Sequence, residues 1–216
     1  MRWSSGAPLF ATALIGLGSA SSAAGTTVVQ DSETGFTFSE YSAAITTGSD
    51  VINFRIAIPS PATDNYDAVI QVISPTSVGW AGLAWGGQMV NCPLTVAWAN
   101  GASAVVSSRR ATSHTTPATN PAATLQLLST GTRANGTHWQ YTAVCAGCTT
   151  FAGAGGQVKT LNPAGANRLA FAYSKTRPSG SSPDAAISVH DVYNYWDHDF
   201  ATAGNADFDA LVQRNQ

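Results

Sequence analysis

The sequence predicts an all-β protein built as an antiparallel β-sandwich. Short segments rich in β-branched and aromatic residues alternate between apolar and polar positions, Gly, Pro, Asn and Asp separate them, and no long stretch has helical periodicity. Parallel sheets need helices between their strands, so the lack of helical segments favours antiparallel pairing. Because no repeat or long linker divides the chain, one domain over residues 25–216 is expected.

The first 24 residues have the order of a secretory signal peptide. Arg2 precedes an apolar run over residues 8–17, and small residues follow over residues 18–24. The apolar run is too short to span a membrane. We therefore predict that residues 1–24 are removed and that the mature protein is secreted, with no membrane partner.

The clearest strand covers residues 52–58, where apolar residues alternate with Asn53, Arg55 and Ala57 until Pro59 ends the run. Asn100-Gly101 predicts a hairpin with a type I′ turn, and loops rich in Gly, Pro, Ser and Thr are expected over 110–122, 152–166 and 174–185. The other predicted strands cover residues 36–41, 68–73, 79–85, 94–98, 104–108, 124–128, 138–144, 169–173 and 186–189.

The charge balance argues against a nucleic-acid partner. The chain has 10 Lys and Arg against 12 Asp and Glu, a net charge of -2, whereas binding to phosphates needs clustered basic residues. Six of the acidic residues fall between Asp184 and Asp209. This spacing predicts a negative surface near the C-terminal histidines.

Secretion affects how the cysteines are interpreted. In an oxidising compartment, Cys145 and Cys148 are expected to form a local disulfide. Thr149 stands where covalent haem attachment requires histidine, so haem c is excluded. Cys92 is then predicted to be a buried free thiol. Asn135-Gly136-Thr137 is an N-glycosylation acceptor, so Asn135 is the predicted glycosylation site.

Two regions could carry chemistry, and they leave three kinds of function open. Met89 follows Gly86-Gly87 and could be a soft sulfur ligand, with His190 or His198 as its partner in a haem electron carrier. Alternatively, exposed aromatic residues could bind sugars, or titratable residues could form a hydrolase site. The sugar-binding candidates are Tyr193, Tyr195 and Trp196, and the hydrolase candidates are His190, Asp197, His198 and Asp199.

Several motifs together resemble the haem b cytochrome domain of fungal cellobiose dehydrogenases and related stand-alone secreted cytochromes. Residues 79–91 (GWAGLAWGGQMVN) and 94–101 (LTVAWANG) resemble the family's strand, axial-methionine loop and following hairpin. Residues 31–38 (DSETGFTF) resemble its opening strand, and 137–139 (THW) and 145–149 (CAGCT) resemble a later strand and a small disulfide loop.

The resemblance implies an immunoglobulin-like sandwich that binds non-covalent haem b at one end. Met89 and His190 would be the axial iron ligands, with His198 as the alternative histidine. Tyr193 corresponds to an aromatic residue against the haem, and His114 stands where relatives have a tyrosine that contacts a haem propionate. Arg109 or Arg110 could also bind that carboxylate.

The function implied by the resemblance is extracellular electron transfer in lignocellulose degradation. An extracellular flavin dehydrogenase would be the electron donor, and a copper-dependent lytic polysaccharide monooxygenase or ferric iron the acceptor. Because the chain stops at Gln216 without a flavin domain, a stand-alone carrier is expected. No catalytic residues are expected, although the carrier could reduce ferric iron. It could also contact a polysaccharide surface. The alternative is a haem-free carbohydrate-binding module.

Overall fold

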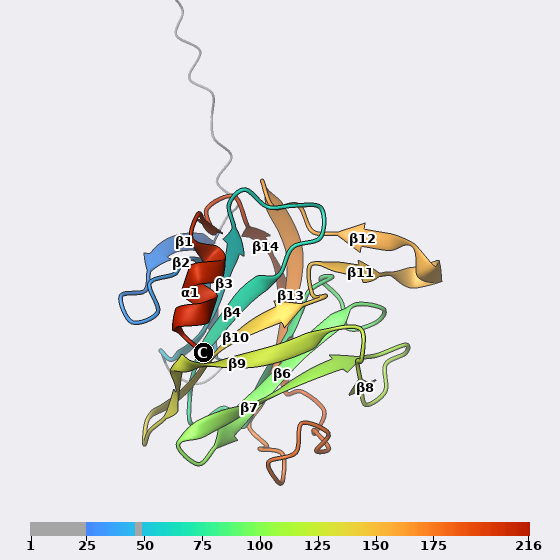
Figure 1. The fold of residues 1–216 in the computed structure, drawn as a ribbon. Helices are drawn as coiled ribbons and strands as arrows, with labels where there is room; N and C mark the ends of the chain where they lie inside the picture. Colours follow the sequence, from blue (N-terminus) through green and yellow to red (C-terminus); the bar gives the residue numbers. More distant parts are fainter. Residues whose placement is uncertain (1–24, 46–48) are drawn as a thin grey trace, which may run out of the picture.

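The computed structural model describes residues 25–45 and 49–216, and two antiparallel sheets pack face to face in it (Figure 1). The predicted signal peptide, residues 1–24, lies outside the described residues. In the part of the chain that is described, no helix has the length and apolar character that a membrane span needs. The predicted all-β, antiparallel fold class is confirmed.

The regular elements are fifteen strands, one short 3-10 helix and one α-helix within the described ranges. They are β1 Thr26–Gln30, β2 Thr37–Ala44, β3 Val51–Pro59, β4 Ala68–Pro75, β5 Trp80–Ala84, β6 Pro93–Asn100, β7 Ser103–Arg110, β8 Ala118–Thr119, β9 Thr124–Ala134, β10 His138–Ala146, β11 Thr150–Ala152, η1 Ala154–Gly156, β12 Val158–Thr160, β13 Ala166–Ser174, β14 Val192–Asp199, β15 Gly204–Asn205 and α1 Phe208–Arg214.

The two large sheets differ in strand order. The first runs β1-β2-β3-β4-β10-β9, with β15 added parallel to β3. The second runs β14-β13-β5-β6-β7-β8. The pair β11 and β12 forms a separate hairpin that projects from the side of the sandwich (Figure 1). The second sheet carries both regions that the sequence singled out, since the Met89 loop joins β5 to β6 and His190 precedes β14.

The main core lies between the sheets and is rich in aromatic side chains. Phe54 of β3 lies 5.8 Å from Phe171 of β13, measured between ring centroids. Tyr41 of β2 stacks on Trp196 of β14 at 4.3 Å. These rings stand at inward-facing positions of their strands, because successive side chains along a strand point to opposite faces of the sheet. Burial of such large apolar side chains is the main force that holds the sheets together.

Each sheet also has an apolar outer face that another part of the chain covers. Helix α1 packs Phe208 against Phe36 and Phe38 on the first sheet, and Figure 1 shows α1 beside β3. On the second sheet, Ala185 and Ile187 pack against an outer-face cluster. That cluster consists of Trp80, Val96, Trp98 and Val105.

The structure confirms the predicted strands with one exception. No strand forms over residues 186–189; that segment is irregular, and the strand begins at Val192. Helix α1, which is too short to show a helical period, was not predicted from the sequence, and neither were the strands β1, β8, β11, β12 and β15. Strand β14 was also missed, because polar residues occupy both of that strand's faces.

Two local predictions are also borne out. Cys145 and Cys148 form a disulfide, with 5.7 Å between their Cα atoms. Strands β6 and β7 form the predicted hairpin, in which Asn100 pairs with Ser103. The turn lies one residue later than expected, because Gly101 has φ +60° whereas Asn100 remains in the strand. Type I′ requires a positive φ at both central residues, and Ala102, the second one, does not have it, so the turn is of type II′ rather than the predicted type I′.

His198 is a fully buried titratable residue of the core, on the inward face of β14. Its Nδ1 accepts a hydrogen bond of 3.0 Å from Trp196 Nε1, and its Nε2 has no hydrogen-bond partner among the described residues. Burial lowers the pKa of this imidazole from 6.5 to about 3, and the backbone of Ser39 on β2 opposes the shift to a smaller extent. His198 is therefore neutral in the folded protein.

His198→Asn is expected to flatten the dependence of stability on pH. In the wild type the contribution of His198 is fully present above pH 6.5 and is lost as the pH falls toward 3, because the unfolded chain takes up the proton first. The slope is about 1.4 kcal/mol per pH unit. Asparagine keeps an acceptor for Trp196 without titrating. Urea denaturation at several values between pH 7 and 5 measures the slope.

The matched control is His138→Asn, which removes an exposed histidine and should keep the wild-type slope. A wild-type slope in His198→Asn would show that the buried imidazole is not the group responsible.

Candidate functional site

The loop that carries Met89 is fixed by backbone hydrogen bonds to both sides. Trp85 N donates to Pro93 O (3.1 Å), Gly87 N to Ala84 O (3.3 Å), and Asn91 N to Ala111 O (2.8 Å). Met89 itself is half-buried and packs at the margin of the main core. The thioether therefore stands on a well-defined loop at the end of β5.

Cys92 is a buried residue at the end of the same loop. The predicted free thiol is confirmed as free and buried, and its Sγ–H donates to Gln88 O at 2.6 Å. Burial raises the pKa of the thiol above its ordinary value, and hydrogen bonds to the backbone of Gly86 and Gln88 offset this only in part. The sulfur remains a neutral thiol that braces the loop.

Gly87 brings the Met89 loop into close contact with β13. Its φ is +73°, and a Cβ placed there would lie 2.7 Å from Arg168 Cγ and 2.8 Å from Arg168 O. Arg168 in turn forms an ion pair with Asp197 of β14 (3.2 Å). Its guanidinium carbon lies 4.3 Å from the centroid of the Tyr195 ring. The sequence analysis gave no role to Arg168, although it links the Met89 loop to β14.

His190 lies at the opposite end of the same sheet, just before β14. The adjacent Asp191 N donates to Tyr173 O (2.8 Å), and the Asp191 carboxylate accepts hydrogen bonds from Lys175 N (2.7 Å) and Ser174 Oγ (3.1 Å). These bonds hold the pKa of Asp191 below its usual value, with the bond from Lys175 N as the main cause. The half-buried His190 ring meets Tyr193 edge to face at 5.1 Å.

Between these two ends the outer face of the sheet is a strip of small apolar residues. The pairing register places Gly82 beside Ala172 and Ala84 beside Ala170, with Leu94 and Val96 of β6 on the adjoining strand. Two of these strip residues, Ala170 and Ala172, are only partly buried. From the Trp80 end of β5 to the Ala84 end is about 13 Å, four residues at roughly 3.3 Å each.

This arrangement fits a haem. Thioether sulfur and imidazole nitrogen are the axial ligand pair of low-spin electron-carrying haems. Met89 and His190 stand on segments at the two ends of a smooth apolar strip, which suits a flat and largely apolar macrocycle. Tyr193 is 65% exposed beside His190 and is free to lie against such a group. Met89, His190 and Tyr193 could therefore hold the cofactor. His198 could not, because it projects into the core from the face of β14 opposite to Tyr193.

His114 and Arg110 lie beside the Met89 loop, while Arg109 is already fully engaged. His114 is exposed and follows Ala111, whose carbonyl bonds to the Met89 loop. Arg110 Nη2 donates to Ala152 O. Every nitrogen of the Arg109 side chain donates to oxygens of the protein. Arg109 is therefore not available to a propionate, contrary to what its place in the sequence implied.

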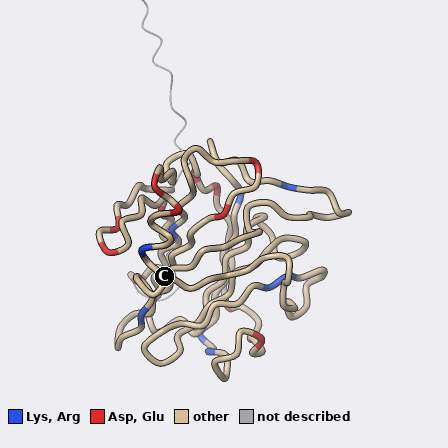
Figure 2. Tube along the Cα trace, viewed as in Figure 1, with Lys and Arg blue, Asp and Glu red and all other residues tan. Residues whose placement is uncertain are grey.

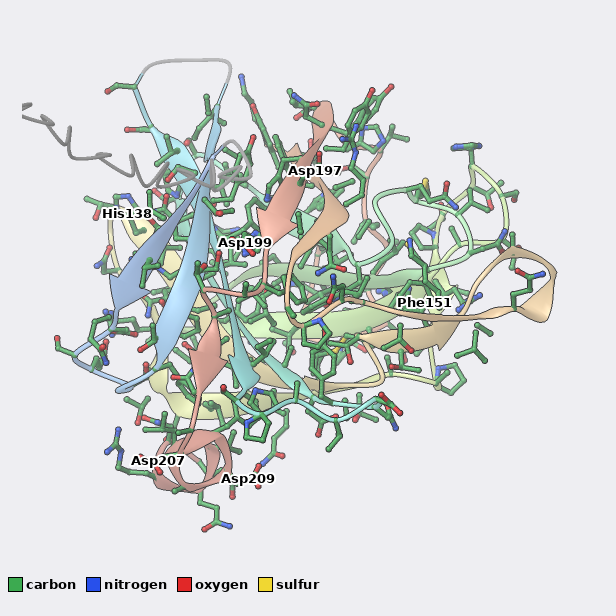
Figure 3. The ribbon with its side chains drawn as sticks, turned by 90° about the horizontal axis from the view of Figure 1, so that it is seen from above. His138, Phe151, Asp197, Asp199, Asp207 and Asp209 are labelled. Atoms are coloured by element: carbon green, nitrogen blue, oxygen red, sulfur yellow. A yellow bond between two sulfur atoms is a disulfide. The ribbon has the colours of Figure 1, made fainter. Side chains whose placement is uncertain are left out.

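The residues of the hydrolase hypothesis do not come together. Asp197 pairs with Arg168 on the outer face of β14, while His198 points into the core. Asp199 accepts a hydrogen bond from Ala201 N in the turn after the strand. Figure 3 shows Asp197 and Asp199 on this strand. Among the described residues, no group of three or more His, Cys, Asp or Glu side chains could hold a metal ion.

The fold also disperses the acidic residues that the sequence places close together. Asp207 and Asp209 lie at the start of α1, well separated from the 175–191 segment in Figure 2. Around His190 itself, Asp184 and Asp191 share the segment with Lys175 and Arg177, which balance them. The acidic residues behind the predicted negative surface are therefore divided between the 175–191 segment, β14 and α1.

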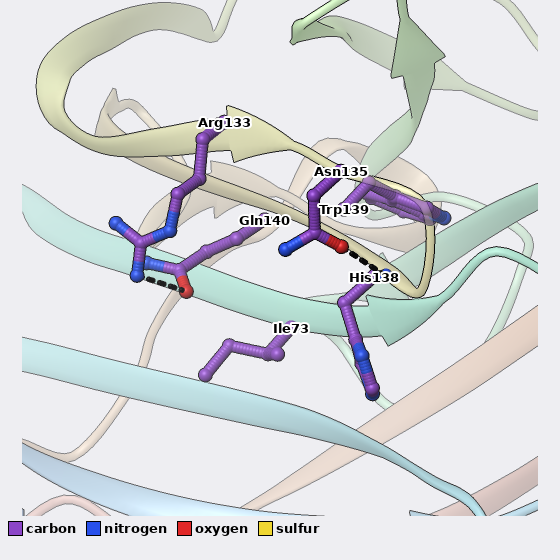
Figure 4. A pocket seen from close by; sticks show the side chains of 6 residues that line it. All are labelled: Ile73, Arg133, Asn135, His138, Trp139 and Gln140. Carbon is purple, nitrogen blue, oxygen red and sulfur yellow. Dashed lines mark hydrogen bonds between the residues drawn. The ribbon is translucent and has the colours of Figure 1, made fainter.

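The predicted glycosylation site, Asn135, lies at the exposed tip of the β9–β10 hairpin. Asn135 Oδ1 accepts hydrogen bonds from Thr137 N (2.9 Å), Thr137 Oγ1 (3.0 Å) and His138 N (2.8 Å). The side chain borders a shallow hollow (Figure 4). The residues that line it are Ile73, Arg133, Asn135, His138, Trp139 and Gln140.

The fold defines the class of the protein: an antiparallel β-sandwich in which Met89 and His190 lie on segments at the two ends of one sheet face. A family model described as the cytochrome domain of cellobiose dehydrogenase matches residues 29–210, and the chain belongs to this family. Family membership confirms the resemblance seen in the sequence. It implies haem binding and a role in electron transfer.

Individual relatives agree. A pyrroloquinoline quinone-dependent pyranose dehydrogenase of Coprinopsis cinerea is 32% identical over 186 residues, which is 85% of this chain and 25% of that protein. The crystal structure of the cytochrome b domain of pyranose dehydrogenase from Coprinopsis cinerea has a TM-score of 0.75 at 25% identity, covering 88% of this chain and 95% of that one. The cytochrome domain of Myriococcum thermophilum cellobiose dehydrogenase has a TM-score of 0.78 at 20% identity, covering 88% and 96%.

Gly87→Ala is expected to lower the free energy of unfolding more than an alanine at a matched glycine. Both substitutions meet the cost of a positive φ, about 1–2 kcal/mol. At position 87 the new methyl group also meets Arg168, which adds about 1–3 kcal/mol. Chemical denaturation measures the difference.

The control is Gly155→Ala, where φ is +68° and nothing lies within 4 Å of the new Cβ. Equal losses in the two variants would show that the Met89 loop is not tightly packed on β13.

Proposed function

We propose that this protein is a haem b electron-transfer protein in which Met89 and His190 are the axial iron ligands. The observation that carries the proposal is their placement on segments at the two ends of the apolar strip formed by β5, β6 and β13. Membership of the cytochrome domain family supports it.

The protein's own residues set the properties of the site. Met89 and His190 would hold the iron, and two protein ligands would leave no position for oxygen or peroxide. When bound, haem supplies reversible one-electron chemistry. Tyr193 meets His190 edge to face and would lie against that side of the group. The residues that face outward from the sheet between the two segments, Gly82, Ala84, Ala170 and Ala172, have small side chains.

We propose that His114 and Arg110 bind the haem propionates. Both stand next to the Met89 loop, and both present N–H groups that can donate to a propionate. Arg110 uses one Nη atom for Ala152 O and retains the other.

The proposed partners are extracellular redox proteins. A flavin-dependent or pyrroloquinoline quinone-dependent dehydrogenase would supply electrons, since one relative, 32% identical, is a pyrroloquinoline quinone-dependent pyranose dehydrogenase. A copper polysaccharide monooxygenase or ferric iron would accept them, the latter as a ferric reductase activity. The chain spans about a quarter of that relative's length. Secretion is proposed from residues 1–24.

One observation favours carbohydrate binding as the second candidate. Tyr193 and Tyr195 are 65% and 53% exposed and lie on the same face of β14, where they could stack on sugar rings. Trp196, the third aromatic residue that the sequence suggested, is buried in the core and cannot take part.

A visible spectrum with ligand variants tests the proposal. Purified protein, or protein supplied with hemin, should give a low-spin haem b spectrum that dithionite reduces reversibly and carbon monoxide does not change. Met89→Ala and His190→Ala should each open a coordination position, so the reduced variants should bind carbon monoxide. His138→Ala, at an exposed histidine of the β9–β10 hairpin, is the control and should behave as the wild type.

Carbon monoxide binding by neither ligand variant would show that the ligands are misassigned. Protein that remains colourless with hemin would contradict the haem proposal. Binding to polysaccharide that depends on Tyr193 and Tyr195 would then support the second candidate.

We also propose that Asn135 carries an N-glycan in a secretory host. Asn135→Gln should lower the apparent mass by one glycan, while Asn162→Gln, at an asparagine outside any Asn-x-Ser/Thr triplet, should not. Gel mobility before and after enzymatic deglycosylation measures both. Identical mobility of Asn135→Gln and the wild type would refute the assignment.

A further inference from the structure

The segment that delivers His190 to the site is held by side chains rather than by a strand ladder. Residues 175–190 contain no strand, and their two ends are fixed by Gly79 N to Ser174 O and by Asp191 N to Tyr173 O, both 2.8 Å. Within the segment, Ala185 N donates to Ser182 O. Its path across the sheet must therefore be set by other contacts.

Arg109 makes several of these contacts. This side chain rises from the outer face of β7 and is only 4% exposed. Its Nη2 donates to Pro183 O and to Ala185 O (2.8 Å), and Nη1 to Pro117 O (3.2 Å). Its Nε donates to Ser107 Oγ (2.6 Å), which in turn donates to Pro183 O (2.6 Å).

The guanidinium has no carboxylate partner within ion-pair distance among the described residues. The nearest acidic group is Asp184, whose carboxylate accepts a hydrogen bond from Thr119. A buried charge without an ion pair is costly unless hydrogen bonds satisfy it. Here those bonds come from carbonyl oxygens of two loops, so the charge can be satisfied only when the loops follow this path.

Two tryptophans of the same sheet face support the rest of the segment. Trp98 Nε1 donates to Gly180 O (3.2 Å), and Trp80 Nε1 donates to Ser188 Oγ (3.1 Å). Ala185 and Ile187 pack on the apolar cluster around these rings. Arg109 binds the middle of the segment, between these two contacts, at Pro183 O and Ala185 O. Ala185 lies five residues before His190.

We infer that Arg109 is a positioning residue for His190. This inference rests on the proposed function, in which His190 is an iron ligand. Arg109 fixes the segment before any cofactor arrives, so the imidazole does not have to be ordered on binding. Without Arg109 the segment would be more mobile, and the affinity for haem and the ligation by His190 would both fall.

Arg109→Lys tests this, because an ammonium keeps the charge but cannot reach Ser107, Pro117, Pro183 and Ala185 together. In the haem-free protein, amides over residues 184–190 should exchange hydrogen roughly tenfold faster than in the wild type. Hemin should bind about tenfold more weakly, as loss of about one buried hydrogen bond predicts. Added imidazole should restore the low-spin spectrum by replacing a displaced His190.

The matched control is Arg177→Lys, an exposed arginine of the same segment that should match the wild type in all three measurements. If Arg109→Lys does not fold, Ser107→Ala removes one bond to Pro183 O and should shift exchange and affinity in the same direction to a smaller extent.

The outcomes separate the two proposals. A wild type that is low-spin, with Arg109→Lys indistinguishable from Arg177→Lys in exchange and affinity, would overturn this inference alone. A wild type that binds no haem would remove both, whatever the exchange rates show. Faster exchange, weaker binding and rescue by imidazole in Arg109→Lys alone would support both.

Discussion

The apolar outer face of the second sheet is the constraint on which the rest of the structure depends. An antiparallel sheet that faces water usually carries polar side chains on that face. Here Trp80, Val96, Trp98 and Val105 occupy it and must be covered. The 175–191 segment covers one part, and the cover ends at His190. The strip that remains, bordered by the Met89 loop, is where we propose the haem. The 175–191 segment thus does two things: it buries this face of the sheet, and it places His190.

Much of the fold could be predicted because strands that bury one face leave a period of two in the sequence. The one wrong strand is instructive. Residues 186–189 alternate like a strand because Ile187 packs down on a sheet, although the segment pairs with no neighbour. Conversely, β14 was missed because Asn194 and Asp197 face solvent while its inward residues include the polar His198. Alternation of apolar and polar residues shows which side chains are buried. It does not show whether the segment forms hydrogen bonds with a neighbouring strand.

The candidate site was predictable only in part. Met89 and His190 were singled out from residue type and a family resemblance, and the structure places their segments at two ends of one surface. The supports of the site were not predictable, because their partners are backbone atoms far away in the sequence. Arg109 binds carbonyl oxygens more than 70 positions later, and any residue type offers such an oxygen. Sequence proximity was also misleading for the acidic residues, which α1 and β14 carry to different sides of the sandwich.

Cys92 has a consequence for which sulfur atom can bind iron. Two sulfurs lie three residues apart in one loop, and a deprotonated cysteine would be the stronger competitor, since the thiolate is the form that coordinates metals. Burial keeps the Cys92 proton in place, and Gln88 O accepts its hydrogen bond. In the proposed site, the protonated cysteine would not compete for iron, and the uncharged thioether of Met89 would be the sulfur donor. A neutral donor favours the ferrous state more than an anionic one does, so the buried proton would help to set the direction in which electrons flow.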